Sequence, residues 1–122
     1  MAERTILWTV TDPRGLNVTC TSDVWNEHVT RHSELSGHVQ DVKICVQDPD
    51  EIYFDPVSTA TKKASVRVYF YYKRGLLSEK FADNFVETCV KVVVENGERQ
   101  GYVQSVIFPN EIRKRLVAEW KK

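Results

Sequence analysis

Residues 25–32 read WNEHVTRH and include two of the three histidines in a chain of 122 residues. At about 100° per residue, a helix through this stretch places both imidazoles in one apolar stripe. The members of that stripe are Val24, Trp25, His28, Val29 and His32. A buried polar group without a partner costs roughly 1–3 kcal/mol, so these histidines need either a structural partner or a chemical task. The pattern alone leaves both readings open, and the structural role is the commoner one on an apolar face.

The segments on either side of this helix predict a hairpin before it and a second helix after it. Residues 4–10 and 16–21 alternate in polarity and flank DPRG at 12–15, a sequence suited to a type I turn. Ser22 is placed to cap the histidine-bearing helix. The second helix is expected over 38–47, because the Asp-Pro pair that follows disfavours the α region.

The second half of the chain predicts an antiparallel sheet and a closing helix. The expected strands cover 51–55, 64–73, 85–95 and 101–108, and the expected helix covers 111–122. Asn96 and Gly97 supply the positive φ values of a hairpin turn between the last two strands. The polar segments between the other elements are expected to be loops. The predicted fold class is therefore α+β, with an N-terminal hairpin and two helices packed on an antiparallel sheet, in one domain spanning 1–122.

The strand expected over 64–73 has two dissimilar faces. One face carries Val66, Val68, Phe70 and Tyr72, and the other carries Arg67, Tyr69, Tyr71 and Lys73. We expect the first set to face the core and the second to be exposed. An exposed basic and aromatic face either stacks bases and holds phosphates of single-stranded RNA or simply keeps an edge strand soluble.

Composition narrows the class of protein without naming a partner. Lys plus Arg equals Asp plus Glu at 17 each, so overall charge neither indicates nor excludes a nucleic-acid ligand. Cys20, Cys45 and Cys89 show no CxxC spacing and are expected to be reduced, partly buried side chains. The first ten residues contain a charged pair and only a short apolar run, which predicts neither a signal peptide nor a membrane span. A cytoplasmic location is therefore expected.

His28 and His32 are four residues apart, so their imidazoles lie on adjacent turns of the helix. A zinc site needs three or four ligands, and this HxxxH lacks the Glu of a zincin motif, so no metal or other cofactor is predicted. Histidine takes and returns protons near neutral pH, which fits acid–base catalysis.

Other candidates surround this pair. Arg31 is either a solvated helix charge or a bidentate phosphate ligand. Lys91 interrupts an apolar strand and is expected on the same face as Cys89 and Val93, as a phosphate ligand or as a snorkelling amine. Ser105 offers an inward hydroxyl or is a small filler residue.

The stretch from Trp25 through the EIYF strand resembles a known family of domains. The matching residues are Trp25, His28, Arg31, His32, Glu34, Gly37, Pro49, Asp50, Glu51 and Ile52. They are similar to the PBECR type of nuclease-like domain, the phage and mobile-element branch of the barnase–EndoU–colicin–RelE superfamily. The later KVVVENGERQGYVQSVIFP resembles the paired strands of that family, with Ser105 in the place of its threonine. The resemblance covers about residues 23–110.

This resemblance implies a BECR-like fold and metal-independent RNA cleavage, in which a ribose 2′-OH attacks the adjacent phosphate. It implies proton transfer by His28 and His32, phosphate stabilisation by Arg31 with Arg67 or Lys91, a phosphate hydrogen bond from Ser105, and base stacking on Tyr71. Arg74 is an alternative to Arg67. RNA is the implied substrate, and an inhibitory antitoxin or immunity protein is the implied partner. The alternative is a catalytically inactive protein- or RNA-binding module on the same fold.

Overall fold

A computed structural model describes residues 5–63 and 65–122, and over these residues the chain forms one seven-stranded sheet with three α-helices. The elements are β1 (Ile6–Thr11), β2 (Asn17–Thr21), α1 (Ser22–Arg31), α2 (Val39–Gln47), β3 (Glu51–Phe54), α3 (Pro56–Ala60), β4 (Arg67–Arg74), β5 (Phe85–Glu95), β6 (Glu98–Ile107) and β7 (Val117–Lys121). The strand order is β1-β2-β6-β5-β4-β3-β7. Among the described strands, β2 and β6 pair in parallel and all other neighbours are antiparallel. The α+β class is confirmed.

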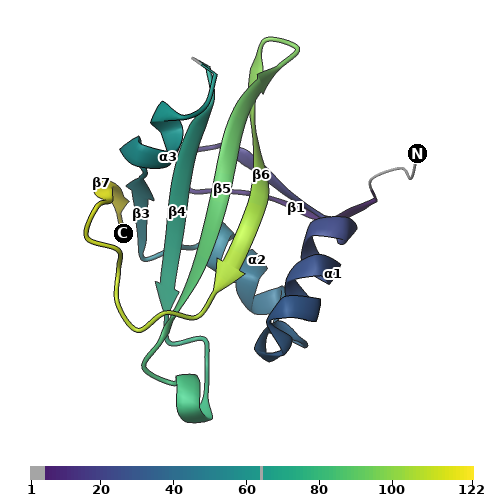
Figure 1. Cartoon of the computed structure of the whole chain (residues 1–122), viewed down its shortest axis with the longest axis vertical. Helices are drawn as coiled ribbons and strands as arrows, with labels where there is room; N and C mark the ends of the chain where they lie inside the picture. The colour runs from purple at the N-terminus through teal and green to yellow at the C-terminus, as the bar shows by residue number, and fades with distance from the viewer. Residues whose placement is uncertain (1–4, 64) are drawn as a thin grey trace.

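The N-terminal hairpin and the two helices after it form where they are predicted, but the prediction that Ser22 caps the first helix is wrong. Gly15 adopts a φ of +88° in the turn between β1 and β2, where a side chain would be strained. Thr21 rather than Ser22 is the residue before α1, and its side chain makes no capping bond. In Figure 1, α2 lies behind the sheet and α1 lies beside β6.

Both faces of the sheet pack against other parts of the chain, and the two faces have different partners. We call the face that packs against α1 and α2 the helix face; its core includes Trp8, Val18, Trp25, Val42, Tyr69, Tyr71 and Val90. We call the opposite side the far face; its buried cluster is Val68, Phe70, Tyr72, Cys89 and Leu116. Strand β4 is therefore buried on both sides. The prediction that Tyr69 and Tyr71 form an exposed surface is wrong, because they lie in the main core and are 5% and 0% exposed.

Segment 109–116, which we call the strap, crosses the far face and leads into β7. The expected helix over 111–122 is wrong: residues 117–121 form a strand that pairs with β3. The spacing of Ile112, Leu116 and Trp120 fits a helix, yet an unpaired β3 edge offers backbone hydrogen bonds that this stretch completes instead. Ile112 and Leu116 pack on the far-face cluster, and Trp120 packs against the main core.

The loop expected after Phe54 contains a short helix. Asp55 accepts hydrogen bonds from the backbone N–H groups of Val57 and Ser58, which caps α3, and Pro56 occupies the first helical position. Both are standard signals for the start of a helix. The short length of α3 hides its periodicity, so the polar composition of the segment favoured a loop.

The sheet has one narrow seam. Asn96 and Gly97 close the β5–β6 hairpin with φ values of +52° and +80°, as predicted. On the other side of β6, strand β2 pairs with it through only two residue pairs, Val18 with Gly101 and Thr19 with Tyr102. A Cβ on Gly101 would lie 3.0 Å from a methyl of Val90 and 3.1 Å from a methyl of Val18, so only glycine fits this crossing without a shift.

Candidate functional site

The two histidines of α1 lie side by side and remain partly exposed. Their ring centroids are 6.4 Å apart. His28 Nδ1 lies 3.2 Å from the backbone oxygen of Val24, which can only accept, so a neutral ring carries its proton on Nδ1 and keeps the Nε2 lone pair. His32 Nδ1 lies 3.6 Å from a carboxylate oxygen of Glu34. The His28 ring therefore keeps an acceptor nitrogen, and the His32 ring has its Nδ1 beside a carboxylate.

Arg31 is on the outer side of the same helix. Its side chain is 66% exposed, and its guanidinium lies 2.6 Å from the carboxylate of Glu27, one turn earlier. Exposed pairs of this spacing contribute only about 0.3–0.5 kcal/mol, so an anion would compete for the guanidinium at little cost. Arg31 is thus available to a ligand that reaches α1.

Ser105 and Lys91 lie on the far face rather than beside the histidines. Ser105 is opposite Cys89, and Lys91 is opposite Val68, both of which belong to the far-face side of the sheet. Lys91 therefore shares a face of the sheet with Cys89, as predicted. Among the described residues, no contact joins His28 or His32 to either side chain.

Tyr71 and Arg67 are separated from the histidines as well. The Tyr71 hydroxyl donates a 2.6 Å hydrogen bond to Asp12, and burial together with that carboxylate raises the pKa of Tyr71. A side chain with no exposed surface has no face on which a base can stack. Arg67 is exposed with its guanidinium 5.9 Å from the Phe54 ring, and Arg74 lies 4.1 Å from the Phe85 ring. The structure therefore divides the expected site among at least two surfaces.

A groove of about 650 Å³ lies where β2, β6 and β5 meet, in a part of the far face that the strap does not line. Its lining includes Thr19, Val24, Lys91, Glu95, Gln100 and Tyr102. Of these, only Lys91 is among the predicted site residues. The alternation of Gln100 and Tyr102 after the Asn-Gly turn, opposite the lysine, would have indicated these two residues, whereas Thr19 and Val24 join them only in the folded chain.

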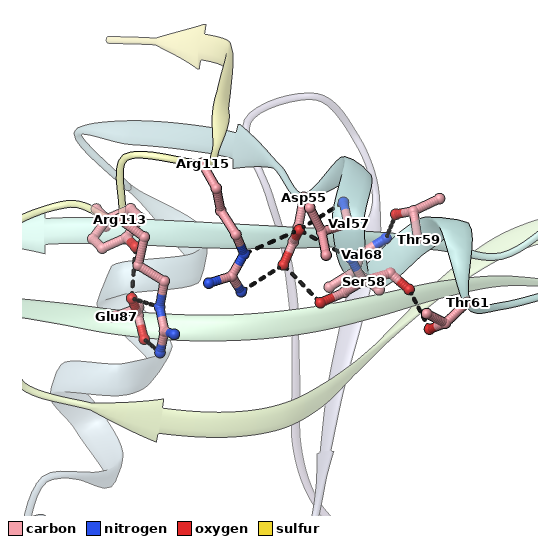
Figure 2. Close-up of polar contacts among 10 residues, drawn as sticks. Asp55, Val57, Ser58, Thr59, Thr61, Val68, Glu87, Arg113 and Arg115 are labelled. Atoms are coloured by element: carbon pink, nitrogen blue, oxygen red, sulfur yellow. Dashed lines mark hydrogen bonds and ion pairs between the residues drawn. The ribbon is translucent and has the colours of Figure 1, made fainter.

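Two buried carboxylates on the far face are tied to the strap (Figure 2). Arg113 makes bonds of 3.0 and 3.1 Å to the two carboxylate oxygens of Glu87, and Arg115 reaches Asp55 at 3.0 Å. Glu87 also accepts from the Tyr72 hydroxyl at 2.6 Å. Burial alone would raise the pKa of Asp55, but its bonds from Arg115 and Ser58 outweigh burial and hold that pKa below its usual value. These groups are fully used in holding the strap and leave no free acid or base.

The third histidine, His38, was not among the predicted site residues and pairs with a nearby carboxylate. His38 Nδ1 lies 2.7 Å from the Asp41 carboxylate at the start of α2, and the imidazole edge meets the ring of Phe108. His38 lines a hollow of about 400 Å³ with Ser33, Glu34, Ser78 and Lys80. A pair three residues apart at a helix start is common in surface helices, so this arrangement is explained by local stability.

No protein-family model matches this chain, and searches of curated proteins and of solved structures return no match. Within residues 5–63 and 65–122, no three His, Cys, Asp or Glu side chains gather as a metal site requires. None of the described helices is long and apolar enough to cross a bilayer. The function must therefore be inferred from the geometry of the chain itself.

Proposed function

We propose that the chain is a metal-independent endoribonuclease whose proton-transfer groups are His28 and His32. The observation that carries this proposal is the adjacency of two partly exposed imidazoles, 6.4 Å apart, on one helix. In-line attack of a 2′-oxygen on phosphorus places the attacking and leaving oxygens on opposite sides, so a base and an acid must flank the phosphate. Two neighbouring imidazoles meet that requirement.

The contacts of each ring support different roles. His28 keeps a lone pair on Nε2 because Nδ1 donates to the helix backbone, which suits the base that takes the 2′-OH proton. His32 has its Nδ1 beside the Glu34 carboxylate, which leaves Nε2 as the nitrogen that would protonate the leaving 5′-oxygen. Arg31 would leave Glu27 to stabilise the charged phosphorane. The products would be a 2′,3′-cyclic phosphate and a 5′-hydroxyl.

A second candidate is an RNA- or protein-binding module that does not cleave. It is favoured by the separation of the predicted residues, since Lys91 and Ser105 lie on the far face and Tyr71 is in the core. Under the nuclease proposal, an inhibitory partner protein would protect the cell that makes the enzyme; the binding module needs none.

The test is RNA cleavage with EDTA present, comparing the wild type with His28→Ala, His32→Ala and the matched control His38→Ala. General acid–base groups contribute about 10²–10⁴-fold to rate, so each of the first two variants should lose at least 100-fold while the control keeps its activity. The melting midpoint of each variant establishes that it folds. Intact RNA after incubation with micromolar wild type, or equal cleavage by the double variant, would leave only the binding module.

A further inference from the structure

Within residues 5–63 and 65–122, the groove between β2, β6 and β5 is a part of the far face that the strap does not cover. The strap and its two arginines occupy the β4 side, whereas the groove opens beyond it with a volume of about 650 Å³. Volumes of this size accommodate small ligands or a short stretch of a polymer. Most of its lining side chains are polar, so an apolar partner surface does not fit it.

The groove carries one cation and one carboxylate, and only the cation lacks a partner among the described residues. Lys91 has no ion pair or hydrogen bond to another described residue. The one carboxylate in the lining, Glu95, accepts a 2.5 Å hydrogen bond from the Tyr102 hydroxyl. The lysine is therefore the group left to bind a ligand, and its partner in a polar groove would be negatively charged.

The remaining lining supplies groups that recognise a base. The amide nitrogen of Gln100 donates to Thr19 at 3.2 Å and to the Gly101 carbonyl at 2.8 Å. This fixes the side chain and leaves its oxygen to accept from an exocyclic amino group. Tyr102 presents a partly exposed aromatic ring directly opposite Lys91 in the β5–β6 register. A ring beside a cation is the arrangement that holds an unstacked base and its phosphate.

The groove also lies next to the proposed catalytic helix. Val24 lines it, and the backbone oxygen of Val24 is the group that His28 Nδ1 contacts one helical turn later. A chain leaving the groove along α1 therefore meets His28 first and His32 next.

We propose that this groove binds a segment of single-stranded RNA, with Lys91 on a phosphate, Tyr102 stacked on a base and Gln100 accepting from a base edge. The inference deepens the proposed function by assigning the substrate-binding surface, and its orientation toward His28 rests on that function. Single-stranded RNA is favoured over a duplex because stacking on Tyr102 requires an unpaired base.

The experiment measures binding of a short single-stranded oligoribonucleotide carrying 2′-methoxy groups, which no 2′-OH mechanism can cleave. Lys91→Gln should weaken binding about fivefold to tenfold and reduce the salt slope by about 0.7, the value for one phosphate on a single strand. Lys43→Gln, which removes the same charge from α2 on the other side of the sheet, should have no effect. Tyr102→Leu should weaken binding by about tenfold, and Tyr102→Phe, which keeps the ring, should restore most of it.

Equal binding by the wild type and Lys91→Gln, or equal loss in Lys91→Gln and Lys43→Gln, would overturn the inference. So would tighter binding of a matched duplex than of the single strand. These results are separable from the cleavage test. Binding that depends on Lys91 without any cleavage would support the groove and reject the nuclease, whereas cleavage unaffected by Lys91 and Tyr102 variants would do the reverse.

Discussion

Tyr71 and Tyr72 are neighbours in β4 that point to opposite faces, and each donates a 2.6 Å hydrogen bond to a buried carboxylate. On the helix face the acceptor is Asp12, whose other oxygen accepts from the backbone N–H groups of Arg14 and Leu16 at 2.9 Å. On the far face the acceptor is Glu87, whose carboxylate also binds the guanidinium of Arg113. Two similar hydroxyls are thus held by different kinds of partner.

The two carboxylates therefore have different effects on the fold. Asp12 is satisfied by its own turn, so the Tyr71 bond connects a rigid hairpin to the core. Glu87 is satisfied by a guanidinium from the strap, 26 residues away, whose side chain is 39% exposed. Losing the Asp12 carboxylate should destabilise the whole domain, whereas losing the Arg113–Glu87 pair should mainly release the strap.

The largest expected effect follows from Asp12→Ala. It leaves the buried Tyr71 hydroxyl and two backbone N–H groups without their acceptor, at a cost of about 3 kcal/mol in the free energy of unfolding. Urea titration should show a lower midpoint by every probe. Tyr71→Phe, which removes a single hydroxyl, should cost about 1 kcal/mol; an Asp12→Ala domain as stable as the wild type would show that the helix face is not held in this way.

A smaller and local effect is expected from Arg113→Ala. The lost guanidinium leaves Glu87 buried, but the strap can open and admit water to the carboxylate, so we expect a cost of about 1–2 kcal/mol instead of the full cost of a buried charge. Hydrogen exchange should accelerate in β7 while the amides of β1 and β2 keep their protection. Lys114→Ala, an exposed neighbour, is the control. Uniform acceleration in all strands would contradict a separable strap.

The smallest effect is a pH dependence carried by Asp55. Because its pKa is held below the usual value, it adds stability that is fully present above the unfolded-state pKa of about 3.9 and disappears as the pH falls through the lower folded-state value. The difference in melting midpoint between pH 7 and pH 3 should therefore be smaller in Asp55→Asn than in the wild type. An unchanged difference would mean that other carboxylates carry the acid sensitivity.

Local patterns predicted the elements whose partners are also local. The alternating runs that form β4 and β5 and the Asn-Gly turn of the β5–β6 hairpin were recognisable because period and turn chemistry agree there. The α1 and α2 helices followed from helical spacing and the break at the following Asp-Pro pair. Asp55 and Pro56 are a recognisable helix start, but α3 is too short to show helical periodicity in the sequence.

What could not be predicted depends on long-range pairing. Ile112, Leu116 and Trp120 satisfy helical spacing, and only the exposed edge of β3 selects a strand for 117–121. Tyr69 and Tyr71 look like a surface stripe because nothing local reveals that β4 is covered on both faces. For the candidate site, the histidine pair was visible from its four-residue spacing. The groove was not, because Thr19 reaches Lys91 and Gln100 only through the β2–β6 crossing.

That crossing has a mechanical consequence. Strand β2 is paired with β6 through only two residue pairs, and Gly101 sets how closely the two strands approach, while the Tyr71–Asp12 bond and the main core also hold the hairpin. The groove spans this crossing, with Thr19 on one side and Lys91 on the other. A change in the spacing between β2 and β6 would alter the width of the groove and also move α1, which follows β2 directly, so a ligand bound in the groove would also set the position of His28.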